Sequence, residues 1–274
     1  MLTFKQFIRE GVEEWSKPIS VDEAIEFLEK NCVQSMKNRP LWRGGPRTRI
    51  SYGDSHLGEP RVSANTSNYY TLIVDNLPAW KFFPKRSRSF IGSSDIDGAY
   101  DVGPGPCLMI PFDNAKVGVC PREDFWTSFD SIESLEDLNY MLSNIIGFME
   151  FECPETWTWE ALKPILKRIT AAGIKDHDVK RTANGLVLDF RTLLLDQGSE
   201  SSSALSGLSR ILAPRDFENY TGADYKVADN KEVFVEGKVI MIAQNLEDAI
   251  NNFDRLKITQ FLKSKNPELA KNLK

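Results

Sequence analysis

Apolar residues recur at helical spacing in several segments of the chain. Ser20 and Glu23 form a capping box, and an apolar stripe from Ala24 to Cys32 follows it. This segment predicts a helix from about 20 to 36, which ends before Pro40. The same periodicity predicts helices over 69–77, 133–151, 154–172, 186–195 and 203–212, and an amphipathic helix that begins after Asn245.

Short apolar or alternating runs predict strands between these helices. The predicted strands cover 41–44, 88–93, 108–111, 232–236 and 239–242. Because Gly237 and Lys238 form a turn between the last two, we expect them to pair as a hairpin. The polar segment 47–67 contains glycine and proline without periodicity, and it predicts a long loop. Separate helices and strands of this kind are typical of an α+β fold.

Composition narrows the class of protein. A chain of 274 residues with 41% hydrophobic and 27% charged residues has the make-up of a folded protein with one large domain or two small ones. Its net charge of −5 argues against general binding to nucleic acid phosphates. No apolar run is long enough to span a membrane, and the N-terminus lacks the apolar core of a secretory signal, so we expect no membrane partner.

The cysteines and histidines argue against metal binding and against nucleophilic catalysis. The four cysteines show no CxxC spacing and the only histidines are His56 and His177, so no metal site is expected. Catalysis by a Ser-His-Asp or Cys-His set would depend on one of these two histidines, and neither has a supporting sequence context. We expect the cysteines to be free buried thiols in a reducing compartment.

The first eleven residues form a distinct segment. Its apolar residues from Leu2 to Ile8 lie near one face of a short helix, which suits either packing on the core or docking on a partner groove. The segment resembles the capsid-targeting sequences of internal head proteins from T-even-type phages, in which Phe-Ile-x-Glu precedes a small residue. The resemblance implies that residues 1–11 bind the phage prohead scaffold and protease, and that the protease cuts between Glu10 and Gly11. It also implies a location in the virion head and then in the host cytoplasm.

Three later elements stand in a suggestive order. They are Arg43 at the end of a strand, the string from Ser89 to Asp95, and a late strand headed by Glu232. Each alone has an ordinary explanation, because arginines form surface ion pairs, serines close turns and strand ends are often solvated.

Together these elements resemble the arginine, serine, glutamate pattern of mono-ADP-ribosyltransferases. The stretch from Asn65 through Phe129, including Arg86-Ser87-Arg88-Ser89 and Asp124-Phe125-Trp126, also resembles phage proteins described as ADP-ribosyltransferases. Trp42-Arg43-Gly44 matches the family's aromatic-Arg-Gly strand, Phe90-Ile91-Gly92-Ser93-Ser94 its aromatic-x-Ser-Thr-Ser strand, and Glu232 the last acid of its Glu-x-Glu strand. The resemblance implies a split β-sheet core with flanking helices, NAD as co-substrate, and a host protein or nucleic acid as acceptor. It implies that Glu232 and Ser93 are catalytic and that Arg43, Gly44, Ser94 and Ser89 bind NAD.

These residue types suit that reaction. Breaking the bond between nicotinamide and ribose builds an oxocarbenium-like cation, which one carboxylate stabilises. A guanidinium matches diphosphate oxygens bidentately, and serine hydroxyls orient the ribose and the carboxylate.

Two positions depart from the family pattern. Gly92 replaces the first serine, and Asn230 stands where the first acid of Glu-x-Glu is expected. That acid helps to select the acceptor in the family, so the acceptor stays open. Glu236, on the same strand face as Glu232, is the reserve candidate for the catalytic acid, and Glu123 is a weaker one.

The long separation between Ser93 and Glu232 requires an insertion in the family's compact domain. We expect residues 1–10 to be a removable targeting segment, 11–130 and 216–274 to form the transferase-like domain, and 131–215 to be a helical insertion.

Two other functions fit the same sequence. The chain could be a non-enzymatic injected head protein that binds and inhibits a host defence component. Its N-terminal segment favours this function, and its acidic balance suits mimicry of acidic partners or nucleic acid. It could also be a structural head protein with a degenerate transferase fold, because fold resemblance alone never secures activity.

The targeting segment leads to a first prediction. If the protease cuts after Glu10, intact mass measurement of the protein from mature virions gives a chain that starts at Gly11. A chain that starts at Met1 would contradict the proposed cleavage.

Overall fold

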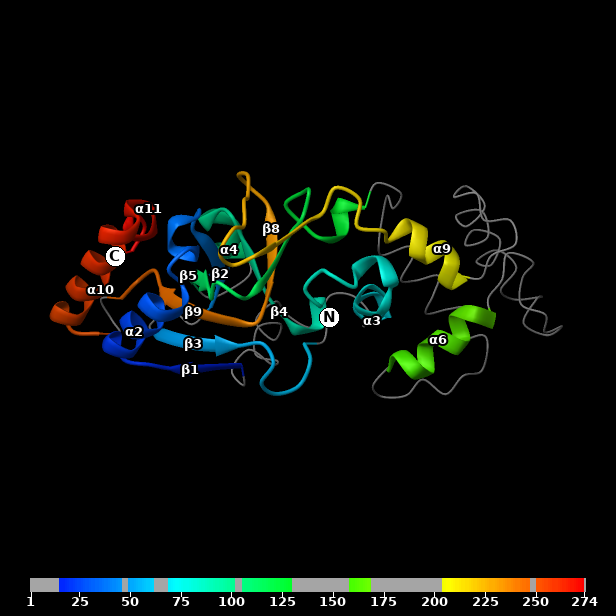
Figure 1. Cartoon of the computed structure of the whole chain (residues 1–274), viewed down its shortest axis with the longest axis horizontal. Helices are drawn as coiled ribbons and strands as arrows, with labels where there is room; N and C mark the ends of the chain where they lie inside the picture. Colours follow the sequence, from blue (N-terminus) through cyan, green and yellow to red (C-terminus); the bar gives the residue numbers. More distant parts are fainter. Residues whose placement is uncertain are drawn as a thin grey trace. The chain divides into compact units, whose positions relative to one another are not determined.

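The computed structural model describes residues 15–45, 49–61, 69–101, 105–129, 158–168, 204–246 and 250–273 (Figure 1). The chain divides into two compact units. The first unit contains residues 1–62, 82–128 and 216–274, and the second contains 63–81 and 129–215.

A large antiparallel sheet forms the centre of the first unit. Nine strands of the described residues are hydrogen-bonded in the order β1-β3-β9-β5-β2-β4-β8-β6-β7. The strands are β1 (Ser16–Pro18), β2 (Leu41–Gly44), β3 (Ile50–Asp54), β4 (Ser89–Ser93), β5 (Pro106–Pro111), β6 (Lys116–Val119), β7 (Glu218–Thr221), β8 (Glu232–Glu236) and β9 (Lys238–Ala243).

The core of this unit includes residues within the curve of the sheet and residues of the helices that pack on it. Every residue of β2, β5 and β8 is buried, including the charged residues Arg43, Glu232 and Glu236. Phe90 of β4 packs edge to face on Trp15, with 5.5 Å between the ring centroids. A Cβ atom on Gly53 of β3 would lie only 2.9 Å from Phe90 Cζ. Because β9, β5 and β2 separate β3 from β4, the sheet must curl to bring Gly53 against Phe90.

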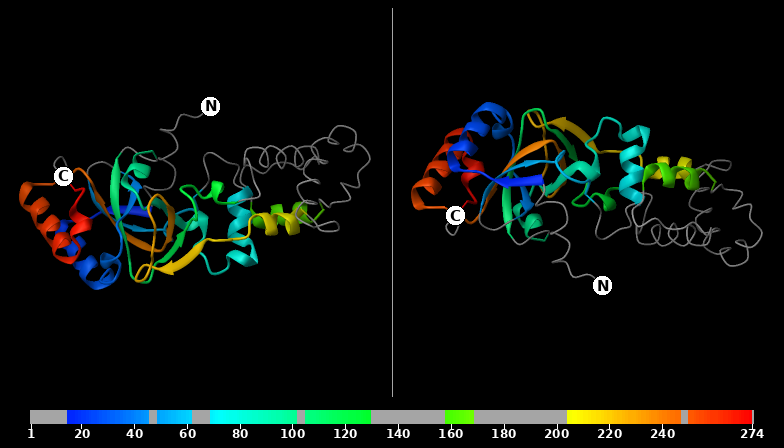
Figure 2. Two further views of the ribbon diagram at one scale, coloured as in Figure 1. Left: turned by 90° about the horizontal axis from the view of Figure 1, so that it is seen from above. Right: turned by 90° about the horizontal axis from the view of Figure 1, so that it is seen from below.

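Helices near both ends of the chain gather beside one another in the first unit, as all views of Figures 1 and 2 show. They are α2 (Val21–Asn31), η1 (Ser35–Lys37), α10 (Asn252–Lys265) and α11 (Pro267–Ala270). Ser20 and Glu23 form the capping box of α2. Lys257 of α10 forms an ion pair with Asp22 of α2, and Leu28 and Leu262 are buried.

Three shorter helices connect the strands of the first unit. α4 (Ile96–Asp101) follows β4 and contacts β2. η3 (Arg86–Arg88) precedes β4, and η4 (Trp126–Ser128) lies in the segment after β6.

Helices make up the described part of the second unit. They are α3 (Tyr69–Asn76), η2 (Pro78–Trp80), α6 (Trp159–Arg168) and α9 (Ala204–Ile211). Trp80 donates its indole N–H to the Leu212 carbonyl at 2.6 Å, and Leu162, Leu166 and Leu208 are buried. Of the expected insertion 131–215, the structure describes 158–168 and 204–215. The unit that contains it also includes residues 63–81.

The mixed α+β class is confirmed. So are the five predicted strands, which correspond to β2, β4, β5, β8 and β9, and the helices that correspond to α2, α3, α6, α9 and α10. The helix predicted from 20 to 36 ends at Asn31, and η1 follows it as a separate turn. The helices predicted over 133–151 and 186–195, and the segment 1–11, lie outside the described residues. Cys32, Cys107 and Cys120 are free and buried, as expected, and burial raises the pKa of Cys107 to about 12.

The predicted hairpin of β8 and β9 is wrong. β8 pairs with β4 and β6, whereas β9 pairs with β3 and β5. Only Gly237 separates the two strands, and the commonest tight hairpins need two turn residues. Gly237 has φ of +126°, a conformation that favours glycine, and it directs the chain from one part of the sheet to another.

The predicted loop over 47–67 is also wrong in part, because it contains β3. This strand has only Ile50 and Tyr52 as apolar residues, so its pattern is too weak to stand out in a polar segment. Five register pairs with β9 satisfy its backbone, and that pairing depends on the tertiary structure. The short strands β1, β6 and β7 were not expected for the same reason.

Gly118 of β6 provides a test of the packing. It lies opposite Phe234 of β8, and a Cβ atom at this position would lie 2.2 Å from Phe234 Cζ. The Phe234 ring is buried and also packs on Phe125, so it has little freedom to move. We expect Gly118→Ala to lower the free energy of unfolding by about 1–3 kcal/mol in urea denaturation. Gly118→Ala combined with Phe234→Leu should recover part of this loss, and an additive loss would contradict the packing.

Candidate functional site

The three strands that carry the motif residues are direct neighbours in the sheet. Their order is β2-β4-β8, although the segments are far apart in the sequence. Trp42 pairs with Ser93, and Ser93 pairs with Glu232, so these three residues form one row across the three strands. Paired residues of antiparallel strands place their side chains on the same face. The row therefore brings Trp42, Ser93 and Glu232 to one face of the sheet.

Arg43 lies on the opposite face of β2, because successive residues of a strand alternate between faces. Its guanidinium is buried, donates from Nη1 to the Ile91 carbonyl at 2.6 Å, and lies 5.6 Å from the centroid of the Phe90 ring. No described residue accepts a hydrogen bond from its Nε. Burial lowers the pKa of Arg43 to about 10, and the neighbouring Cys107 opposes this shift. In this position Arg43 joins β2 to β4.

Glu232 is held in a closed polar and aromatic enclosure. Its Oε1 forms a buried ion pair with Arg86, and its Oε2 accepts a hydrogen bond from the backbone N–H of Phe125 at 2.9 Å. The Arg86 guanidinium lies 4.1 Å from the Phe125 ring centroid and within 6 Å of the Trp126 and Phe234 rings. These contacts hold the Glu232 carboxylate in one position, in a site from which water is largely excluded. Such a carboxylate can stabilise a developing positive charge.

Backbone and hydroxyl groups fasten the start of β8 to the end of β4. Ser94 N–H donates to the Lys231 carbonyl at 2.9 Å, and Lys231 N–H donates to Ser94 Oγ at 2.9 Å. Asn230 has φ of +54°, a left-handed conformation that asparagine tolerates well. Its side chain donates to Glu123 Oε2 at 2.8 Å. Asn230 therefore shapes the turn into β8.

The other predicted residues divide between the two ends of β4. Ser93 Oγ accepts the Asp95 N–H at 3.0 Å, next to the start of α4. Ser89, at the far end of the strand, donates to the Lys85 carbonyl and pairs with Glu236. Glu236 accepts the Lys85 N–H at 2.8 Å and forms an ion pair with Lys116.

The structure thus groups Ser93 and Ser94 with Glu232 and places Ser89 with Glu236. Gly44 lies buried in β2 opposite Pro106. Glu10 and Gly11 lie outside the described residues.

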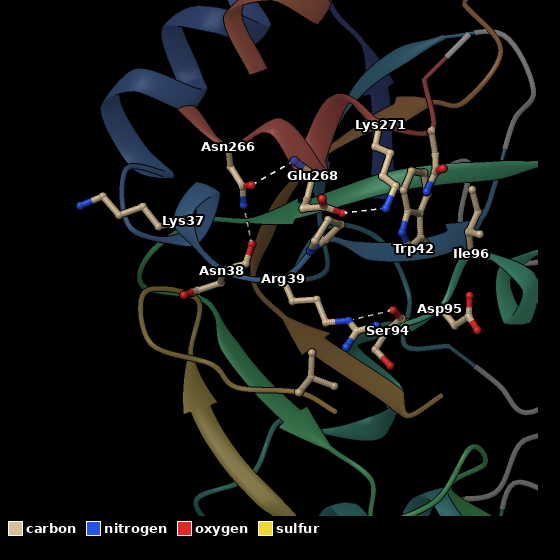
Figure 3. Close-up of a pocket in the computed structure, with 13 residues that line it drawn as sticks. Lys37, Asn38, Arg39, Trp42, Ser94, Asp95, Ile96, Asn266, Glu268 and Lys271 are labelled. Carbon is tan, nitrogen blue, oxygen red and sulfur yellow. Dashed lines mark hydrogen bonds and ion pairs between the residues drawn. The ribbon is translucent and has the colours of Figure 1, made fainter. Parts of the chain in front are cut away.

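A pocket of about 590 Å³ lies beside the junction of β2 and β4 (Figure 3). Trp42 and Ser94 line it, whereas Arg43 and Glu232 do not. Three cations, Lys37, Arg39 and Lys271, and two carboxylates, Asp95 and Glu268, also line it. The remaining lining residues are Asn38, Pro40, Ile96, Val227, Asn266 and Asn272.

A second pocket of about 450 Å³ lies at the other end of β8, beyond Glu236. His56, Lys30, Lys116 and Lys238 line it together with Glu236. Lys116 forms an ion pair with Glu236 at 3.4 Å, and His56 Nε2 lies 4.0 Å from the same carboxylate.

The sequence did not identify Arg86, Phe125 and the pocket cations as members of the site. Arg86 and Phe125 lie in the stretch that resembles phage proteins, but the resemblance gave neither of them a role. Arg39 and Lys271 come together because α11 packs near the start of β2, and no sequence spacing records that contact.

No described helix is long and apolar enough to cross a membrane. Within the same described ranges, no three or more His, Cys, Asp or Glu side chains gather as a possible metal site. No protein-family model matches the chain, and no curated protein or solved structure shows significant similarity to it.

The buried ion pair makes a further prediction. Arg86→Met leaves the Glu232 carboxylate buried without its cation, so we expect the free energy of unfolding in urea to fall by about 3–5 kcal/mol. Arg88→Met is the matched control, because Arg88 is half-buried and donates to the Gly58 carbonyl. We expect it to cost about 1 kcal/mol. An equal fall in the free energy of unfolding in the two variants would show that the buried ion pair stabilises the fold no more than the hydrogen bond of Arg88 does.

Proposed function

We propose that the protein is an ADP-ribosyltransferase of the arginine, serine, glutamate class, with a split-sheet core of that family, and that it transfers ADP-ribose from NAD to a host macromolecule. The observation that supports this most is the row of Trp42, Ser93 and Glu232 across three adjacent strands. The row brings one residue from each of three motifs, which are distant in the sequence, to one face of the sheet. The pocket beside the row adds a place of suitable size for a ligand.

In this proposal Glu232 stabilises the positive charge that develops on the ribose. In the reaction, the bond from ribose C1′ to nicotinamide breaks, nicotinamide leaves with the electron pair, and the acceptor nucleophile bonds to C1′ and loses its proton. Both oxygens of Glu232 are already engaged, by Arg86 and by Phe125 N–H. A ribose hydroxyl must therefore share or replace one of these donors.

The serines and Arg43 have supporting roles. Ser93 lies between Trp42 and Glu232 in the row and positions the ribose, and Ser94 connects the pocket to the start of β8. The family resemblance assigns NAD binding to Arg43, Gly44 and Ser89. In this structure the Arg43 guanidinium engages Ile91 and faces away from Glu232, so we assign Arg43 the role of holding β4 in place.

The proposed location of this activity is inferred from the sequence of residues 1–11. Their resemblance to capsid-targeting sequences supports a phage protein that is packaged in the head and injected with the genome. We therefore propose that the acceptor is a protein or nucleic acid of the host cytoplasm.

A labelled-NAD assay tests the transferase proposal. Purified protein is incubated with host lysate and with NAD labelled in its ADP-ribose part, and label in macromolecules is measured together with released nicotinamide. We expect Glu232→Gln to lower transfer by roughly 10²–10³-fold, because the charge that stabilises the transition state is lost. Glu26→Gln is the control, because Glu26 is an exposed residue of α2, and its activity should match the wild type.

Other outcomes distinguish Glu232 from Glu236 as the catalytic acid, and a transferase from a non-enzymatic inhibitor. Loss of transfer in Glu236→Gln, with Glu232→Gln active, would move the catalytic role to Glu236. Wild-type protein that neither labels host material nor releases nicotinamide would contradict the transferase. Stable capture of a host partner by both the wild type and Glu232→Gln would then favour a non-enzymatic inhibitor.

A further inference from the structure

We infer that the pocket beside the β2–β4 junction binds the ADP-ribose part of a nucleotide, with Arg39 and Lys271 as the cations that hold its phosphates (Figure 3). This inference rests on the proposed function and adds where the co-substrate sits and which residues hold it. It differs from the family resemblance, which gives the phosphate-binding role to Arg43.

The position of Arg43 excludes it from this pocket. Its side chain lies on the face opposite Trp42, is buried against Phe90, and donates to the Ile91 carbonyl. A phosphate could reach this guanidinium only if the contact between Arg43 and Phe90 opened and the core were exposed. The cations that face the pocket come from other segments.

Three segments bring cations to the pocket. Lys37 ends η1, Arg39 precedes β2, and Lys271 follows α11. Arg39 donates to the Ser94 carbonyl at 3.3 Å and forms an ion pair with Asp229, whose side chain is 84% exposed. Such exposed pairs are weak, so a phosphate can replace Asp229 as the partner of the guanidinium.

The pair of Lys271 and Glu268 is similarly open to exchange. Their charged atoms are 3.4 Å apart, and both side chains are more than half exposed. Lys37 donates to Gln34 at 2.9 Å, a neutral partner that leaves its charge uncompensated by this contact. Arg39 and Lys271 are therefore accessible to an anionic ligand, whereas the Lys37 side chain points away from them (Figure 3).

The two carboxylates of the pocket restrict which anionic ligands can bind there. Asp95 and Glu268 line the same pocket and would repel inorganic phosphate or diphosphate. They can instead accept hydrogen bonds from the hydroxyl groups of a ribose. Pro40, Ile96 and Val227 add apolar surface for the carbon skeleton of a sugar or base. A ligand with phosphates, ribose hydroxyls and an aromatic base satisfies the whole lining.

The pocket is also connected to the proposed catalytic residue. Ser94 lines the pocket, and its hydroxyl accepts the N–H of Lys231, the residue that precedes Glu232. Ser93, next to it, pairs with Glu232. A nucleotide seated here lies beside the strand ends that hold the carboxylate.

Binding of ADP-ribose to the full chain, measured by isothermal titration calorimetry, tests the inference. We expect Arg39→Gln and Lys271→Gln each to weaken binding by roughly tenfold, because each loses one charge-assisted phosphate contact. Lys30→Gln is the matched control, because it removes an exposed lysine from the second pocket. Its affinity should equal that of the wild type. Inorganic diphosphate should bind more weakly than ADP-ribose.

A chemical footprint gives a second readout on the unmutated protein. Acetylation of lysines, read by mass spectrometry, should show that ADP-ribose protects Lys271 but not Lys30 or Lys116. Absence of ADP-ribose binding, equal weakening by Lys30→Gln, or absence of protection would overturn the pocket assignment.

The outcomes separate this inference from the proposed function. If ADP-ribose binds with the expected pattern but no label is transferred from NAD, the pocket assignment stands and the transferase fails. If label is transferred and Arg39→Gln and Lys271→Gln leave KM for NAD unchanged, the transferase stands and the pocket assignment fails.

Discussion

The junction between β2 and β4 is the contact on which the rest of the first unit depends. Between these strands Trp42 and Ser93 are the one register pair, whereas the other neighbouring strands of the sheet share three or more. Arg43 strengthens the junction by its bond to the Ile91 carbonyl, and Phe90 fills the space inside the curve of the sheet. Both the row with Glu232 and the pocket lie at this place.

Two buried arginines set the electrostatics around the junction. Arg43 is balanced by a carbonyl and an aromatic face, whereas Arg86 is balanced by the Glu232 carboxylate. Burial of charge opposes folding, so hydrophobic packing elsewhere must offset it. Well-packed apolar residues would stabilise the same positions as well or better. The presence of buried arginines here is consistent with a site that needs fixed charges.

At the junction, the two faces of the sheet carry residues with different roles. Arg43 acts from the inner face, where it holds strands together, and Glu232, Ser93 and Trp42 share the other face with the pocket. The proposed transferase uses this division, because binding cations and a stabilising carboxylate then meet the nucleotide from one side. Arg43 engages the Ile91 carbonyl, and in our proposal Arg39 and Lys271 contact the phosphates in its place.

The sequence by itself determined the elements whose signal is local. The capping box of Ser20 and Glu23 and the apolar run of β9 predicted their elements because periodicity and capping act within one segment. The resemblance of three sequence motifs to those of a known family also placed Arg43, Ser93 and Glu232 in one set. Only the tertiary structure decided that β8 and β9 pair apart, that β3 is a strand and that Arg43 and Glu232 lie on opposite faces. It also decided that Arg86 pairs with Glu232 and that Lys271 lines the pocket beside β2. Strand pairing, alternation of faces and contacts between distant segments depend on neighbours that no local pattern encodes.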